Sequence, residues 1–161
     1  MNGSQQLVST IYDGWHTYQQ ALLEAIAPLT RAQLGLRAGP GLRSVQQIAQ
    51  HMIGARARWF YMLMGEGGEA FEALGRWDRP GAPSRSAEEL ASGLERTWAG
   101  MQEAIGRWTD EQWQQTWPGE EGDPDTVTRQ WVIWHLIEHD VHHGGEISLT
   151  LGAHGVRALA L

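Results

Sequence analysis

Apolar residues recur at alternating steps of three and four in four stretches of this chain, and this spacing constrains the fold more than any other feature. Such steps place apolar side chains on one face of a helix. The stretches cover residues 8–26, 45–62, 90–108 and about 126–151. No comparable alternation typical of strands is found. The sequence therefore predicts an all-α fold, a bundle of four helices that bury their apolar faces against one another.

Local signals mark where these helices begin. Ser44-x-x-Gln47 and Ser86-x-x-Glu89 are capping boxes, in which each side chain can bond a free backbone N–H of the first helical turn. Short helical turns are expected at 30–34 and 110–113. The segments 35–43, 65–84 and 118–125 are rich in Gly, Pro or acids and are predicted to be loops. The long middle one is typical of a lid or a crossover, and residues 1–161 are expected to form a single domain.

Charge and composition exclude several function classes. The chain carries 12 basic and 19 acidic residues, a net charge of −7, and no basic cluster, so nucleic acid is not an expected partner. No apolar run is long enough to span a bilayer, and the polar residues after Met1 do not resemble an export signal, so we expect a cytoplasmic protein. With no cysteine, any bound metal must be held by nitrogen and oxygen.

Histidine clustering is the most unusual feature of the sequence. Four of the seven histidines fall between His135 and His143, and His135, His139 and His143 recur every four residues. Residues four apart lie nearly above one another on a helix, so two adjacent imidazoles such as those of His139 and His143 can share one ion. His51 lies beside the apolar stripe of another predicted helix and is the candidate third ligand, because bundles build metal sites from facing helices.

Ordinary explanations stay open for these histidines. Two histidines four residues apart, such as His139 and His143, occur by chance about as often as they occur because they bind a metal. If the site were purely structural, His135 or an acid would close the coordination shell as a fourth ligand. The remaining histidines are expected to be ordinary surface or hydrogen-bonded residues: His16, His142 and His154.

Several charged residues near the candidate ligands could assist them. Asp140 follows His139 as Glu follows the first His in His-Glu-x-x-His metalloproteases, so its carboxylate is a candidate general base, with a solvated carboxylate as the alternative. Glu138 and Glu146 could orient a ligand through its second ring nitrogen. Arg56 and Arg58 could bind an anionic substrate group. The acids at 120–125 do not fit a calcium loop and predict an exposed loop.

Two segments resemble the DinB-like family of small bacterial four-helix-bundle metalloproteins. Arg43-Ser-Val-Gln-Gln-Ile-Ala-Gln-His51 is similar to the family segment that ends in the second-helix histidine, and His139-x-x-x-His143-Gly-Gly-Glu is similar to its His-x-x-x-His-Arg-Gly-Gln motif. The resemblance covers nearly the whole chain. It departs at Gly144, where the family often has Arg, and at Glu146, where it often has Gln.

This resemblance implies an up-down-down-up bundle, metal ligands at His51, His139 and His143, and a homodimer. It also implies a divalent transition metal, with zinc or nickel favoured because imidazole accepts both. The expected activity is that of a metal-dependent hydrolase or of a transferase with a low-molecular-weight thiol as cosubstrate, acting on a small molecule. The alternatives are a non-enzymatic metal-binding or stress-associated protein and a bundle with an empty site.

Overall fold

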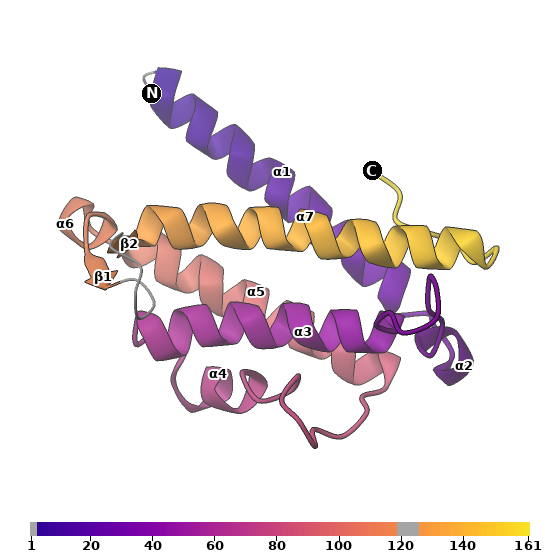
Figure 1. Cartoon of the computed structure of the whole chain (residues 1–161). Helices are drawn as coiled ribbons and strands as arrows, with labels where there is room; N and C mark the ends of the chain where they lie inside the picture. The colour runs from indigo at the N-terminus through magenta and orange to yellow at the C-terminus, as the bar shows by residue number, and fades with distance from the viewer. Residues whose placement is uncertain (1–2, 119–125) are drawn as a thin grey trace.

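Four long helices form a bundle in the computed structural model, which describes residues 3–118 and 126–161. They are α1 (Gly3–Ile26), α3 (Val45–Arg58), α5 (Ala87–Arg107) and α7 (Arg129–Ala153). In Figure 1, α1 and α7 run from left to right, whereas α3 and α5 run from right to left. The order is up-down-down-up, as the resemblance implied, and the all-α prediction is confirmed.

The capping boxes begin their helices where the sequence predicts. The Ser44 and Ser86 side chains accept hydrogen bonds from the backbone N–H groups of Gln47 and Glu89, whose own side chains bond back to the caps. The same reciprocal pattern starts the two short helices α2 (Arg31–Leu34) and α6 (Asp110–Trp113). Both short helices agree with the helical turns predicted at 30–34 and 110–113. Each capping box joins residues only three apart, so it is a local feature of the sequence.

The connection between α3 and α5 is more ordered than predicted. The chain leaves α3 through a π-helical turn, η1 (Trp59–Leu63), and then forms α4 (Gly68–Leu74) inside the segment expected to be a loop. Phe71 and Leu74 are buried against the bundle, and this tertiary packing stabilises α4. The glycines around α4 made the segment look like a loop in the sequence. Because α3 and α5 are parallel, this segment must return along the bundle, as a crossover does (Figure 1).

A short β-hairpin contradicts the expectation of no strands. β1 (Thr116–Pro118) pairs antiparallel with β2 (Thr126–Thr128), with Thr116 opposite Thr128. Strands of three residues are too short to show an alternating pattern, so apolar spacing could not predict them. The acidic run at 120–125 lies outside the described residues.

Helix α7 buries a different face from the one its apolar spacing indicated. Five residues carry the apolar spacing that predicts this helix from the sequence: Trp131, Trp134, Val141, Ile147 and Leu149. Of these, Ile147 is buried, but Trp131, Trp134, Val141 and Leu149 are exposed by 44%, 62%, 51% and 67%. The buried face instead combines Val132, Leu136 and Leu151 with the polar Asp140 and His143. Apolar residues lie on both sides of α7, so their spacing alone could not select the inner face.

The exposed apolar side chains of α7 are compatible with a partner surface, and the homodimer stays a prediction. Within residues 3–118 and 126–161, no helix combines the length and the apolar character that crossing a bilayer requires.

Gly144 allows α1 to approach α7 closely. A Cβ at this position would lie 2.3 Å from Tyr18 Oη, and that hydroxyl donates a hydrogen bond of 3.2 Å to the Val141 carbonyl. We expect Gly144→Ala to lower the free energy of unfolding by about 1–3 kcal/mol in urea denaturation, because the added methyl group overpacks this contact. The control is Gly145→Ala, where a Cβ would meet nothing within 4 Å. Equal stabilities of the two variants would contradict the role of Gly144.

Candidate metal centre

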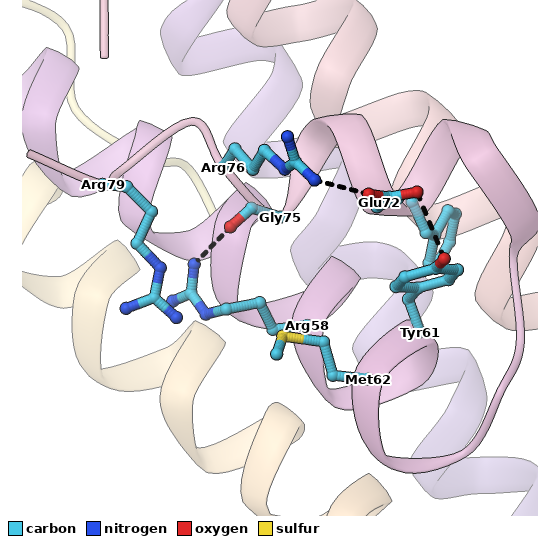
Figure 2. Close-up of a pocket in the computed structure, with 8 residues that line it drawn as sticks. Arg58, Tyr61, Met62, Glu72, Gly75, Arg76 and Arg79 are labelled. Atoms are coloured by element: carbon cyan, nitrogen blue, oxygen red, sulfur yellow. Dashed lines mark hydrogen bonds and ion pairs between the residues drawn. The ribbon is translucent and has the colours of Figure 1, made fainter. Parts of the chain in front are cut away.

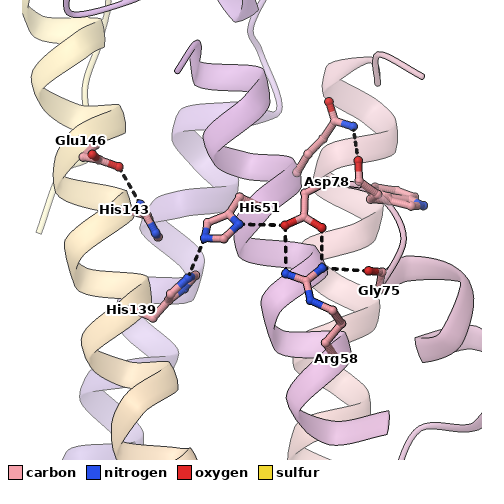
Figure 3. A network of polar contacts seen from close by, with 9 residues as sticks. His51, Arg58, Gly75, Asp78, His139, His143 and Glu146 are labelled. Carbon is pink, nitrogen blue, oxygen red and sulfur yellow. Dashed lines mark hydrogen bonds and ion pairs between the residues drawn. The ribbon is translucent and has the colours of Figure 1, made fainter. Parts of the chain in front are cut away.

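Three histidines from two helices converge between α3 and α7, as the sequence predicted. His51 lies midway along α3, and His139 and His143 lie on successive turns of α7. Each offers one ring nitrogen to a group in which all these atoms lie within 4.8 Å of one another. Figure 3 shows the three rings turned toward one another across the two helices.

The spacing of the ring nitrogens fits a common ion. His51 Nε2 and His139 Nε2 are 3.2 Å apart. Two nitrogens bound tetrahedrally at about 2.0–2.1 Å from one zinc ion are separated by about 3.3 Å. The two imidazoles therefore already stand at the separation that shared coordination requires.

The surroundings of His139 and His143 favour their neutral imidazole forms, which can donate a lone pair to a metal. Burial, together with the smaller effects of the neighbouring His143 and His51, lowers the pKa of His139 to about 3. Burial also lowers the pKa of His143, against the opposing effect of its hydrogen bond to Glu146. Metal binding requires the neutral imidazole, so these two ligands need not lose a proton at neutral pH.

Asp78 holds His51 in the orientation that presents Nε2 to the cluster. Its Oδ2 lies 2.8 Å from His51 Nδ1, so that nitrogen carries the proton and Nε2 keeps its lone pair. Arg58 binds both oxygens of this carboxylate and also donates to the Gly75 carbonyl at 2.8 Å (Figure 3). Although burial alone would raise the pKa of Asp78, the hydrogen bonds from His51 and Arg58 outweigh it and hold that pKa well below its usual range.

The crossover that carries Asp78 is fastened to α3 beside the ligand. Gln50, which precedes His51, donates hydrogen bonds of 2.7 Å and 3.1 Å to the carbonyls of Trp77 and Pro83. Sequence reasoning missed Asp78 because it falls in a segment predicted to be a loop, far from the histidines in the chain. A single Asp among glycines, prolines and arginines carries no motif that could have revealed it.

Glu146 gives His143 a similar support. Its Oε2 lies 2.6 Å from His143 Nδ1, in agreement with the orienting role considered from sequence. Glu138, considered for the same role, lies instead 3.5 Å from His135 Nδ1. His139 differs from the other two, since its Nδ1 is buried and has no hydrogen-bond partner among the described residues.

Asp140 lies in the bundle interior and not in the histidine cluster. Its fully buried carboxylate accepts hydrogen bonds of 2.7 Å from Trp15 Nε1 and 2.7 Å from Arg56 Nη2. These contacts join α1, α3 and α7, and they engage the oxygens that a general base would need. Arg56, considered as an anion ligand, is equally buried and committed to Asp140. The catalytic prediction for Asp140 gains no support from this placement.

The other histidines lie around the cluster. His135 stacks on Trp131 with ring centroids 5.0 Å apart and does not join the ligand group. His16 packs against Trp98, and His154 Nε2 lies 2.9 Å from the Arg37 carbonyl. His142 is exposed, although it forms a second group with His143 and Glu146 whose ligand atoms also lie within 4.8 Å of one another.

Gly54 makes room for the carboxylate that orients His51. A Cβ there would lie 2.6 Å from Asp78 Oδ1 and 2.8 Å from Arg58 Nη1. We expect Gly54→Ala to displace Asp78 and weaken zinc binding about 10–100-fold, the usual loss when a group that orients a metal ligand is removed. Competition with a chromophoric chelator measures the zinc affinity. The control is Gly106→Ala on α5, where a Cβ meets nothing within 4 Å; the same zinc affinity in both variants would refute the role of Asp78.

Comparison with known proteins supports this fold. A DinB-like protein from Bacillus cereus aligns with a TM-score of 0.74 and 19% identity, covering 96% of this chain and 97% of its own. A conserved protein from Enterococcus faecalis gives a TM-score of 0.64 at 17% identity, covering 94% and 99%. A DinB-like protein from Bacillus subtilis gives 0.63 at 15%, covering 94% and 96%. At these identities the likeness shows the fold alone.

Sequence comparison gives the family. No curated protein matches this chain. The sequence profile of the DinB family, however, matches residues 1–161, the whole of the chain. Together with the four-helix fold, this match shows that the chain belongs to the DinB family.

Proposed function

We propose that this protein is a metal-dependent enzyme that binds one divalent transition-metal ion, zinc or nickel, on His51, His139 and His143. The observation that carries the proposal is the convergence of three ring nitrogens within 4.8 Å, without a fourth protein ligand in the described part of the chain. The proposed activity is hydrolysis of a small molecule or transfer of a group to a low-molecular-weight thiol.

The donor set suits zinc and nickel. Three neutral imidazoles without a thiolate or a converging carboxylate favour the borderline transition metals over magnesium or calcium, which prefer oxygen. The choice between zinc and nickel then depends on which metal the cell supplies.

An open coordination position favours an enzyme over a structural site. A structural site would need a fourth ligand, for which His135 or an acid was the expectation. The His135 ring instead packs against Trp131 and Trp59, with centroids 5.0 Å and 5.2 Å away. The acids beside the cluster, Asp78 and Glu146, bond the Nδ1 atoms of His51 and His143. Exogenous water or thiol can therefore occupy the remaining position.

The protein's own side chains prepare this chemistry. A divalent ion held by three neutral imidazoles supplies Lewis acidity that makes a water or a thiol a nucleophile at neutral pH. Asp78 accepts a hydrogen bond from Nδ1–H of His51, and Glu146 accepts one from Nδ1–H of His143, which fixes both tautomers and makes both imidazoles better donors through Nε2. Arg58 in turn holds the Asp78 carboxylate in place through both of its oxygens.

Cobalt(II) reports on the open position directly. We expect the cobalt-substituted protein to develop a thiolate-to-cobalt charge-transfer absorption when it is titrated with 2-mercaptoethanol, because a thiol can enter the fourth position. Ethylene glycol, which replaces the thiol with a hydroxyl, should give no such absorption. If cobalt is bound but 2-mercaptoethanol leaves its spectrum unchanged, the coordination shell is closed and the structural alternative holds.

A further inference from the structure

A pocket of about 280 Å³ lies beside α4 and the end of α3 (Figure 2). Arg58, which lines it, binds the carboxylate of Asp78 that also bonds His51 (Figure 3). Three arginines line it, Arg58, Arg76 and Arg79, together with Tyr61, Met62 and Phe71. A cationic lining is unusual in a chain whose net charge is −7, and of the three arginines only Arg58 takes part in the proposed metal centre, through Asp78.

Two of the arginines are held in place by the protein. Arg58 is fixed by Asp78 and by the Gly75 carbonyl. Its guanidinium is therefore already oriented, and contact with a ligand would cost little further side-chain freedom. Arg76 is paired with Glu72. The Glu72 carboxylate is also engaged by the Tyr61 hydroxyl at 3.2 Å, so the acid beside the pocket has a partner at both oxygens.

Arg79 differs from both. Its guanidinium makes no hydrogen bond or ion pair with any residue that the structure describes, and Figure 2 shows it extending toward the same side of the pocket as that of Arg58. Asp78 already compensates the charge of the Arg58 guanidinium, whereas the Arg79 guanidinium has no acidic partner among the described residues. A carboxylate or phosphate accepts paired N–H bonds from such groups.

The rest of the lining is apolar. The Met62 side chain is 72% exposed, and its flexible thioether can adapt to an apolar group, while Phe71 and the Tyr61 ring complete the wall. A volume near 280 Å³ matches a small molecule and not a peptide segment.

We propose that this pocket binds a small organic anion, a carboxylate or phosphate ester whose acidic group meets Arg79 and Arg58 and whose apolar body packs on Met62, Phe71 and Tyr61. The site is built without the histidines, so it does not depend on an ion at His51, His139 and His143.

Calorimetric titration tests this with benzoate and phenyl phosphate as probes and benzamide as the neutral analogue of benzoate. At least one of the two anions should bind, and which of them binds more tightly tells whether the pocket prefers carboxylate or phosphate. We expect Arg79→Gln to weaken that binding about tenfold or more, because a charged hydrogen-bonding partner is lost. Arg96→Gln, an equal charge change on the exposed face of α5, should leave it unchanged.

Three results would overturn the proposal. The first is equal binding of benzamide and benzoate, and the second is equal anion affinity in the Arg79→Gln and Arg96→Gln variants. The third is loss of anion binding in His139→Ala, which would place the anion at the histidines. Retention of binding in that variant supports the pocket even where no metal is held.

Discussion

The buried ion pair between Arg56 and Asp140 fixes how α3 meets α7, and the metal centre depends on that register. Both side chains are fully buried, and Trp15 of α1 completes the contact by donating to the same carboxylate. Removing one partner of such a pair leaves an uncompensated buried charge and costs about 3–5 kcal/mol. Asp140 is adjacent to His139, and Arg56 is five residues from His51, so the pair that aligns the helices also brings their imidazoles together.

The three histidines differ in how firmly hydrogen bonds to their Nδ1 atoms hold them. His51 is held by Asp78, which Arg58 and the crossover hold in turn, whereas His143 relies on the half-exposed Glu146. The buried Nδ1 of His139 has no partner among the described residues. A buried polar atom without a hydrogen bond costs about 1–3 kcal/mol, and ligation through Nε2 would leave this cost at Nδ1 in place. The site thus combines one firmly oriented ligand with one in a dry environment.

Local rules predicted the parts of this structure that local forces determine. The capping boxes at Ser44 and Ser86 placed two helix starts, and the spacing of His139 and His143, with His51 on a facing helix, gave the cluster. Asp78 was beyond reach because tertiary contacts from Gln50 and Arg58 put it there. The inner face of α7 was also misjudged, since a polar interaction of Asp140, and not apolar spacing, decides which side is buried.

Metal content tests the three-histidine centre most directly. Elemental analysis of protein purified without a histidine tag should find one zinc or nickel ion per chain, and the His139→Ala variant should have lost it, because two imidazoles remain where three are needed. Circular dichroism of the variant checks that the bundle is still folded. Native protein without stoichiometric metal, or a folded variant that retains it, would contradict the centre.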